Sequence, residues 1–229
     1  MATFDGPKIT TSGLILSLDA ADKTSYPGSG TSWKDLSGNG YNGTLTNGPT
    51  FSAANRGNIV FDGVDDYVVT SNFTPNVTNK TLSGWVKLSS VSQQGGGVIN
   101  LQSTDGSTFD SIVYNETNDG WGFGSNSFAR TGWSGVKETS TNSWVYITAT
   151  YENLSYKIYR NGLLIYTLTS FNALNFNFSS QSVIGYRHTG GASGAYLSAN
   201  IAICQIYNRV LSASEVLQNY NATKSRFGL

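Results

Sequence analysis

The chain has 229 residues, of which 14 are Lys or Arg and 14 are Asp or Glu, so its formal net charge at neutral pH is +0. Charged residues make up 12% of the sequence, about half of the usual share. A neutral surface argues against nucleic acid and against anionic membranes as partners, because both need clustered Lys and Arg. Uncharged sugars remain compatible with such a surface.

The first residues, MATFDGPKITTSG, contain no apolar segment of the length of a signal peptide. No stretch approaches the roughly 20 apolar residues of a membrane span, so we expect a soluble protein without membrane insertion. Cys204 is the only cysteine, which excludes an internal disulfide framework. Its place in the apolar run 201–204 predicts a small buried side chain.

Short runs rich in β-branched and aromatic residues follow an N-terminal arm, residues 1–12, that shows little periodicity. These runs predict strands at 13–19, 59–61, 67–69, 81–88, 98–101, 112–114, 121–123, 144–151, 156–160, 163–168, 182–186 and 197–207. No helical pattern separates them. The order excludes folds that alternate strands and helices, and predicts an all-β, two-sheet antiparallel β-sandwich of the jelly-roll type.

A β-hairpin is the plainest local prediction, because Asn161-Gly162 separates two strand-like runs and both residues tolerate the positive φ of a type I′ turn. The register that follows pairs Arg160 with Leu163, Tyr159 with Leu164, Ile158 with Ile165 and Lys157 with Tyr166. Apolar groups then fall on both sides of the ribbon. We therefore expect the hairpin to lie within a larger sheet, with a second sheet packed on one face.

One short helix is predicted near the C-terminus, over residues 212–223. Ser212 and Glu215 match a capping box, in which each side chain bonds to the backbone amide of the other residue. A helix of this length is not stable alone in water, so we expect it to dock on the sandwich. The domain then spans residues 13–224, and residues 225–229 form a tail.

Three segments carry a family resemblance when they are taken together: LILSLDAADKTSYPGSGTSWKDLSGNGYNGTLTNGPTF (14–51), IVFDGVDDYVV (59–69) and IAICQIYNRVLSASEVLQNYNATKSRFGL (201–229). In this order they resemble the laminin-G-like branch of the concanavalin A-like lectin/glucanase superfamily. The compact form also resembles standalone proteins of bacteriophage particles. The resemblance implies a jelly roll that often binds sugars and often serves as a surface or attachment module.

We therefore expect a non-catalytic virion surface, decoration or fibre-type protein, located at the virion surface, that binds glycans or neighbouring subunits. Homo-oligomerisation is left open. The arm Met1–Ser12 and the tail Lys224–Leu229 are then contact elements, and removing both should leave the melting of the fold intact. A free-standing bacterial carbohydrate-binding lectin is the alternative, and a glycoside hydrolase is the third.

The hydrolase hypothesis is the least favoured, because retaining hydrolysis needs two carboxylates about 5–5.5 Å apart. The glucanase branch supplies them from a Glu-x-Asp-x-x-Glu pattern, which this sequence lacks. Its four glutamates are each isolated: Glu116, Glu138, Glu152 and Glu215. We expect no enzymatic activity.

A calcium site is a second candidate, because Asp62, Asp65 and Asp66 cluster hard oxygen ligands of the kind that Ca²⁺ takes. Asp19 and Asp22 are candidates for lying nearby. The same segment suits a tight turn in which Asp side chains bond backbone amides. We favour the turn, and calcium stays open as a cofactor.

Large aromatic residues in glycine-rich surroundings offer a sugar site. The candidates are Trp121, Trp133, Tyr186, Arg187 and His188. Sugars stack on aromatic rings while a few polar groups bond their hydroxyls. The alternative is that the tryptophans belong to the core, which we favour for Trp121 and weigh equally for Trp133. Arg187 and His188 have the alternative role of capping a loop.

Overall fold

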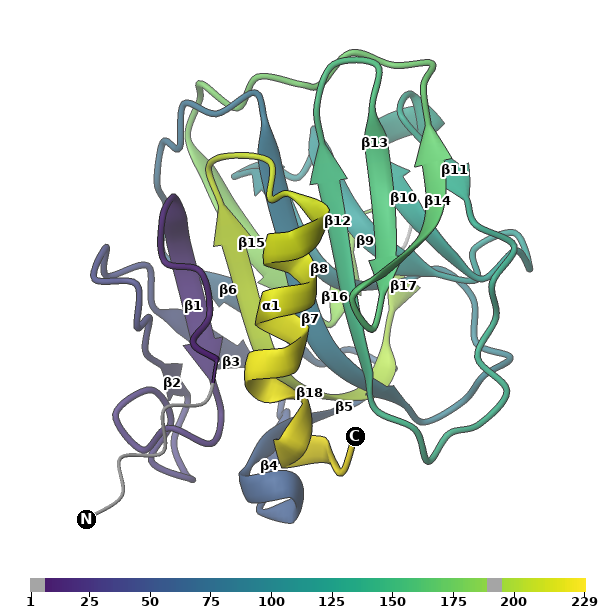
Figure 1. The fold of residues 1–229 in the computed structure, drawn as a ribbon. Coiled ribbons are helices and arrows are strands. Elements are labelled where there is room, and N and C mark those ends of the chain that lie inside the picture. The colour runs from purple at the N-terminus through teal and green to yellow at the C-terminus, as the bar shows by residue number, and fades with distance from the viewer. Residues whose placement is uncertain (1–6, 189–194) are drawn as a thin grey trace.

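Strands of β-branched and aromatic residues, separated by turns rich in glycine and asparagine, form two large antiparallel sheets in the computed structural model (Figure 1). The structure describes residues 7–188 and 195–229, so part of the predicted arm at 1–12 lies outside the described residues. The sheets stack face to face. The predicted all-β, two-sheet sandwich with one short C-terminal helix is confirmed.

Sheet A is the sheet that the helix covers. Its strands run in the order β14 (Leu163–Leu168), β13 (Tyr156–Arg160), β12 (Val145–Tyr151), β7 (Lys80–Leu88), β18 (Ser198–Tyr207), β5 (Asn58–Asp62) and β4 (Thr50–Ser52). β1 (Leu14–Asp19) pairs with the second half of β18, beyond the residues that pair with β5. The first strand of the chain therefore lies beside the last one.

Sheet B forms the other layer, and no α-helix of the described residues covers its outer face. Its strands run in the order β11 (Gly132–Trp133), β10 (Trp121–Ser125), β9 (Phe109–Tyr114), β8 (Gly96–Ser103), β15 (Ser180–Ile184), β6 (Tyr67–Thr70), β3 (Gly43–Thr46) and β2 (Ser32–Trp33). A small ribbon, β16 (Tyr186–Arg187) with β17 (Ala195–Tyr196), continues from β15. Short 3₁₀ turns are η1 (Ala54–Arg56), η2 (Asn126–Phe128) and η3 (Lys224–Phe227).

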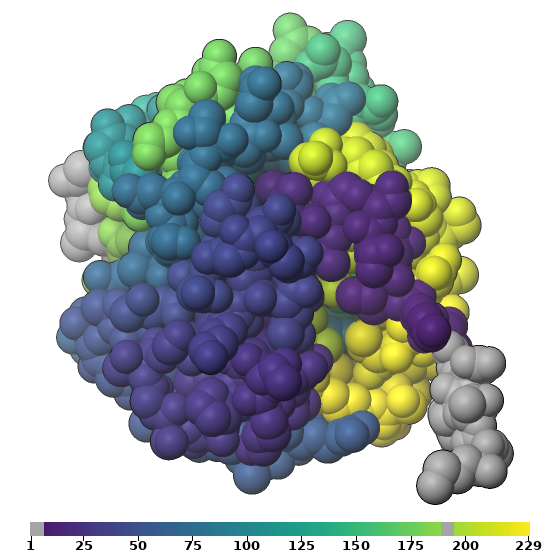
Figure 2. Space-filling model, turned by 90° about the vertical axis from the view of Figure 1, so that its left-hand side faces the viewer, coloured from purple at the N-terminus to yellow at the C-terminus, as the bar shows by residue number. Residues whose placement is uncertain are grey.

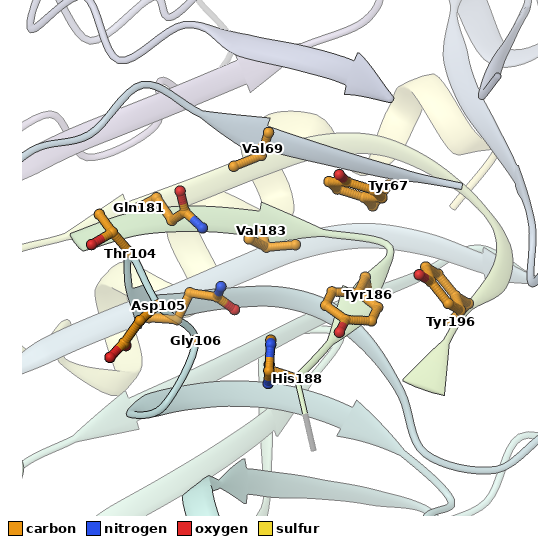
Figure 3. Close-up of a pocket in the computed structure, with 11 residues that line it drawn as sticks. Tyr67, Val69, Thr104, Asp105, Gly106, Gln181, Val183, Tyr186, His188 and Tyr196 are labelled. Atoms are coloured by element: carbon orange, nitrogen blue, oxygen red, sulfur yellow. The ribbon is translucent and has the colours of Figure 1, made fainter. Parts of the chain in front are cut away.

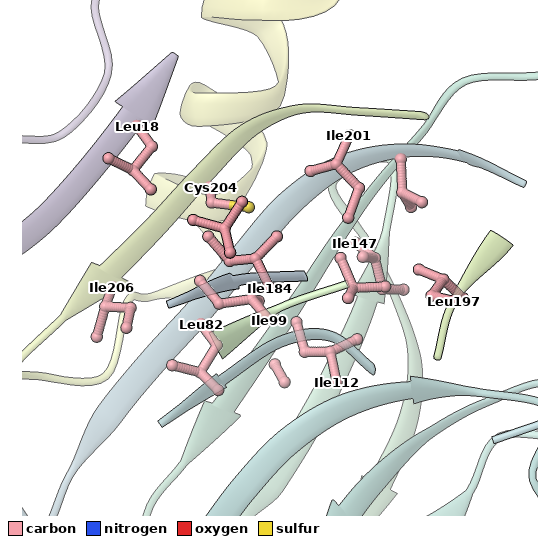
Figure 4. Close-up of a cluster of buried hydrophobic side chains, with 14 of the residues drawn as sticks. Leu18, Leu82, Ile99, Ile112, Ile147, Ile184, Leu197, Ile201, Cys204 and Ile206 are labelled. Atoms are coloured by element: carbon pink, nitrogen blue, oxygen red, sulfur yellow. The ribbon is translucent and has the colours of Figure 1, made fainter. Parts of the chain in front are cut away.

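The main core lies between the two sheets (Figure 4). Leu82 and Ile147 enter it from sheet A, and Ile99 and Ile112 enter it from sheet B, each fully buried. Burying one such side chain contributes about 1.5–3 kcal/mol. Cys204 is buried in the same cluster, as its apolar surroundings predict, and burial raises the pKa of its thiol above the usual range.

A second apolar cluster fills the space between the outer face of sheet A and the C-terminal helix. Trp85 points into it from β7, on the face opposite to that of Leu82. The ring of Phe227 stacks on that of Trp85 at a centroid distance of 4.1 Å. The helix therefore covers an apolar part of the outer face of sheet A.

Helix α1 (Ala213–Thr223) begins at the predicted cap. Ser212 Oγ accepts from the amide of Glu215 at 3.3 Å, and Glu215 Oε2 accepts from the amide of Ser212 at 2.8 Å. Val216 packs into the second cluster, which docks the helix as expected. Among the described residues, no helix has the length and apolar character that crossing a membrane requires.

The predicted tail packs inside its own fold. Arg226 donates to Asp19 at 2.6 Å and to the carbonyl of Asn55 at 2.7 Å, and Phe227 is 8% exposed. On the described part of the arm, the amide of Thr10 donates to α1, and Figure 2 shows the N-terminal segment against the C-terminal residues. Contacts of either segment with neighbouring subunits stay a prediction.

The predicted hairpin register is correct at the turn and wrong further along. Asn161 and Gly162 both have positive φ, and Tyr159 pairs with Leu164. Ile158 then pairs with Tyr166 rather than with Ile165, because Ile165 forms a bulge. A bulge of one residue shifts every later pair by one and increases the local twist of the ribbon, and nothing in the turn residues signals it.

One buried ion pair joins the two sheets. Lys80 Nζ on β7 lies 2.8 Å from Asp110 Oδ2 on β9, and both side chains are fully buried. Arg130 donates to the other carboxylate oxygen of Asp110 at 3.0 Å. The Lys80 ammonium also lies 4.7 Å from the centre of the Phe176 ring. Burial lowers the pKa of Lys80, and the nearby Asp110 carboxylate partly offsets that effect.

Candidate functional site

The outer face of sheet B carries an open cleft of about 420 Å³ (Figure 3). Its walls come from β6, β15 and β8, from the loop after β8, and from the β16–β17 ribbon. The residues that line it are Tyr67, Val69, Gln102, Thr104, Asp105, Gly106, Gln181, Val183, Tyr186, His188 and Tyr196. The cleft thus combines three tyrosines with several neutral polar side chains.

The floor of the cleft follows from strand register. Val69 on β6 lies opposite Val183 on β15, and Gln181 on β15 lies opposite Gln102 on β8. Side chains alternate between the two faces of a strand, so a position next to a core residue faces outward. Val68, for example, is buried in the core between the sheets, which turns its neighbours Tyr67 and Val69 toward the cleft.

The aromatic wall begins where β15 ends, at Gly185. This residue has φ 79°, and a Cβ there would lie 2.4 Å from the Phe61 ring, so only glycine fits the turn. The turn carries Tyr186 out over the sheet. Its ring lies 4.7 Å from that of Tyr196 and 5.9 Å from that of Tyr67. Burial raises the pKa of Tyr186, so its hydroxyl stays neutral.

His188 closes the cleft on the side of the β8–β9 loop. Its ring meets that of Tyr186 edge-on at a centroid distance of 5.9 Å. A Cβ on Gly106 would lie 2.3 Å from the imidazole, so the ring packs directly on the backbone of this glycine. Figure 3 shows the imidazole standing between Tyr186 and the loop that carries Asp105.

Two polar groups of the cleft differ sharply in how they are bonded. Asp105 at the rim is exposed, and one of its oxygens accepts from Ser103 Oγ at 2.5 Å, from the Ser107 amide at 3.0 Å and from Ser107 Oγ at 2.8 Å. These bonds lower the pKa of Asp105 to about 2. Gln102 is 3% exposed, and its Oε1 accepts no hydrogen bond from the described residues.

Arg187 stands behind the wall rather than in the cleft. Its Nε donates to the carbonyl of Gly95 at 3.0 Å, and its Nη2 bonds to Glu116. The Arg187 and Glu116 side chains are 6% and 12% exposed. Burial raises the pKa of Glu116, an effect that the Arg187 charge partly offsets. The guanidinium is therefore occupied within the protein.

The structure brings together only part of the predicted sugar site. Tyr186 and His188 line the cleft. Trp121 is fully buried in the core and bonds to Glu138 through its indole nitrogen at 2.7 Å, so no sugar can stack on it. Arg187 is not among the lining residues, because its buried guanidinium bonds through Nε to Gly95 and through Nη2 to Glu116.

Trp133 is half-buried and lies at the far edge of the same face. It belongs to β11, four strands from β15, which corresponds to about 19 Å. A Cβ on Gly122 would lie 2.0 Å from its ring, so the indole lies flat on β10. Trp133 therefore belongs to no common site with Tyr186.

Nine of the eleven lining residues were not predicted from the sequence, and the larger polar and aromatic ones among them are Tyr67, Gln102, Asp105, Gln181 and Tyr196. Strand alternation gives a signal for one of them, since Tyr67 precedes the apolar Val68 that must face the core. The others come together because β8, β15 and β6 are adjacent in sheet B, although these strands are far apart in the sequence.

The aspartate segment forms the predicted turn. Asp62 Oδ1 accepts from the amide of Val64 at 2.7 Å, and Asp66 Oδ2 accepts from the amide of Asp62 at 3.0 Å. Oxygens of Asp62, Asp65 and Asp66 still lie within 4.8 Å of one another, which suits a hard cation. Burial raises the pKa of Asp66, and the charges of the other two raise it further.

Asp19 does not lie near this cluster. It pairs with Ile203 on β18, whereas Asp62 pairs with Ser198. Five residues along a strand correspond to about 16 Å. The aspartate turn remains a candidate calcium site.

Together the two sheets and the cleft define an antiparallel β-sandwich with an open cleft on one face. The family model described as concanavalin A-like lectin/glucanases superfamily matches residues 62–217, more than half of the chain. This protein therefore belongs to the concanavalin A-like lectin/glucanases superfamily. No curated protein matches the sequence.

Solved structures share the fold at low sequence identity. Domain 4 of an extracellular arabinanase from Geobacillus stearothermophilus, in complex with arabinotriose, is 16% identical with a TM-score of 0.73, over 91% of this chain and 98% of that one. A Trypanosoma rangeli sialidase is 16% identical with a TM-score of 0.70, over 98% of this chain and 36% of the sialidase. This chain thus spans about a third of the sialidase.

A third structure concerns the botulinum neurotoxin type C, whose cell entry depends on interaction with two ganglioside molecules. It is 15% identical with a TM-score of 0.63, over 92% of this chain and 51% of that one. At these identities the likeness shows a shared fold.

Proposed function

We propose that this protein is a non-catalytic glycan-binding protein and that the cleft on sheet B holds the sugar. Sugar-binding sites combine apolar walls with a few polar groups that fix the orientation of the ligand. Here Tyr67, Tyr186 and Tyr196 supply the walls, and Gln102 and Gln181 supply neutral polar groups. Family membership and the carbohydrate complexes named for the structural neighbours support the proposal.

The observation that carries the proposal is the buried oxygen of Gln102. An acceptor left without a donor in a protein interior costs about 1–3 kcal/mol. Gln102 lines the cleft, and its Oε1 is buried and unbonded among the described residues. A rotation of the side-chain amide exposes this oxygen to a ligand, and a sugar hydroxyl can donate to it.

The absence of catalysis is part of the proposal and is supported by how the carboxylates are used. Glycoside hydrolysis needs one carboxylic acid that can donate a proton and a second carboxylate. Asp105 is the carboxylate among the described lining residues, and its low pKa makes it a poor proton donor. Three glutamates are engaged in ion pairs, at Glu116, Glu138 and Glu215.

A glycan array followed by calorimetry tests the proposal. We expect array hits, and we expect Tyr186→Ala to weaken binding at least tenfold while the melting temperature stays within a few degrees. Phe128→Ala is the matched control, because Phe128 is 60% exposed and lies outside the cleft. A blank array, or equal binding by both variants, would overturn the proposal. Release of reducing sugar from any polysaccharide would overturn its non-catalytic part.

The finer part of the proposal is a place on a virion surface, which rests on the sequence resemblance to proteins of bacteriophage particles. A sugar-binding sandwich displayed there would attach particles to glycans. Mass spectrometry of purified particles from a culture that carries the gene tests this part. Detection at a fixed copy number per particle supports it, and detection only among cell proteins favours the free-standing lectin.

A further inference from the structure

Few ionisable groups line the cleft. Apart from the tyrosines, the ionisable groups among the described lining residues are Asp105 and His188, and neither Lys nor Arg is among them. Residues 189–194, which follow His188, read Thr-Gly-Gly-Ala-Ser-Gly in the sequence and carry no ionisable side chain. A ligand in this cleft therefore meets no lysine or arginine from these residues.

The guanidinium of Arg187 does not supply the missing positive charge. Arg187 follows Tyr186 in the chain, but it is 5% exposed and bonds to Glu116 and to the carbonyl of Gly95. Releasing it would leave the nearly buried Glu116 carboxylate without its partner, which is strongly destabilising in comparable pairs. The Arg187 guanidinium is therefore held by groups of the protein itself.

The one fixed charge at the rim is negative. Three hydrogen bonds hold the pKa of Asp105 at about 2, so the carboxylate is ionised throughout the neutral range. Thr104 and Asp105 also line a second depression of about 370 Å³, which extends to Phe178. A sugar chain that runs from the tyrosines to Phe178 passes this carboxylate.

An anionic sugar would therefore lose hydration in the cleft without gaining a cation. Sites for carboxylate or sulfate use Arg or Lys, because charge-assisted hydrogen bonds offset the cost of removing water. We infer that the cleft selects uncharged sugar chains and disfavours those that carry carboxylate or sulfate groups, and that Asp105 sets part of this selectivity. The inference rests on the proposed function and names the ligand class of the same site.

The first test uses an array that holds neutral oligosaccharides beside their sialylated, uronic acid and sulfated counterparts. Measurements at pH 8 keep histidine side chains in general neutral. We expect neutral members to bind and their anionic counterparts to bind at least tenfold more weakly. Equal or stronger binding of the anionic counterparts would overturn the inference and leave glycan binding standing, and a blank array would overturn both.

The second test changes the charge at the rim. Asp105→Asn keeps an oxygen for the Ser107 amide and removes the negative charge, so anionic counterparts should gain at least threefold in affinity at 20 mM salt. The gain should shrink at 500 mM salt, because salt screens exposed charges. Glu152→Gln on the opposite sheet makes the same change in net charge and should give no gain. An unchanged ratio for Asp105→Asn would overturn the role of Asp105.

The third test supplies the missing cation. Gln181 lies on the cleft side of β15 and is half-buried. Gln181→Lys should raise the affinity for sialylated or sulfated counterparts at least tenfold relative to the neutral members. Failure to shift the ratio, with folding intact by circular dichroism, would show that charge does not govern ligand choice here.

Discussion

The guanidinium of Arg187 and the carboxylate of Glu116 form a nearly buried ion pair on the outer face of sheet B. The pair connects the β16–β17 ribbon to the loop after β9. Arg187 lies between Tyr186 and His188 in the chain, and both of these reach the cleft. The geometry of the cleft wall thus depends on an ion pair that does not face the ligand.

Removing the arginine should destabilise the protein. Arg187→Ala leaves the Glu116 carboxylate buried without its partner, so we expect the free energy of unfolding to fall by about 3 kcal/mol. Urea denaturation measures it. The double variant Arg187→Met with Glu116→Leu should recover part of the loss, because no charge is then left unpaired. Equal losses in the single and double variants would contradict this account.

The packing of Phe227 revises the expectation for the tail. Its ring stacks on Trp85 and lies 4.8 Å from that of Trp144, so Phe227→Ala opens a cavity beneath the helix. We expect a loss of about 3 kcal/mol in the free energy of unfolding, measured by chemical denaturation. Leu229→Ala is the control, since Leu229 is 50% exposed. An unchanged stability for Phe227→Ala would restore the tail as a separable contact element.

Local chemistry predicted the elements that depend on near neighbours in sequence. Ser212 with Glu215 predicted the start of α1. Asn161-Gly162 placed the hairpin turn. In each case the deciding contacts lie within a few residues, so a pattern of spacing carries the information.

The site could be predicted only in part, because it depends on strand order. Tyr67 and Tyr186 meet because β6 and β15 are neighbours in sheet B, although more than 100 residues separate them in the sequence. The pairing of Lys80 with Asp110 across the sandwich is of the same kind. Trp121 belongs to the core, as we favoured from the sequence although its surroundings are rich in glycine.

The aspartate turn should not need a metal ion. Oxygens of Asp62 and Asp66 already accept from backbone amides, so we expect 2 mM calcium and excess chelator to give the same melting temperature. An ion that binds the folded state would raise it with concentration. Asp65→Asn should stabilise slightly at neutral pH by a few tenths of a kcal/mol, because it removes a like charge near Asp66. A calcium-dependent shift that Asp66→Asn abolishes would establish a metal site.

The cap of α1 makes stability depend on pH. Bonds from Arg209, together with those from Ser212, lower the pKa of Glu215 to about 2, against an ordinary value of 4.5. Because the folded state lowers this pKa, the stabilisation is complete above pH 4.5 and is lost as the pH falls toward 2. Glu215→Gln keeps the cap but loses the charge, so it should cost about 1 kcal/mol at pH 7 and almost nothing near pH 2. Urea denaturation across this range measures the difference, and a constant difference would contradict the assignment.

The unbonded oxygen of Gln102 should lower the stability of the fold and contribute to glycan affinity. Gln102→Met keeps the length of the side chain and removes the unbonded oxygen, so the free energy of unfolding should stay the same or rise by about 1 kcal/mol. Glycan affinity should fall at least tenfold, or about 1.4 kcal/mol. Calorimetry and urea denaturation measure the two effects on the same preparation.

Gln205 provides the matched control for this substitution. It is also 3% exposed, but its Oε1 accepts from Ser83 Oγ at 3.4 Å on sheet A, away from the cleft. Gln205→Met should therefore lower the stability and leave glycan binding unchanged, the reverse of Gln102→Met. If both variants lose stability and neither loses affinity, the oxygen of Gln102 serves the fold alone, and the cleft loses the observation on which its assignment rests.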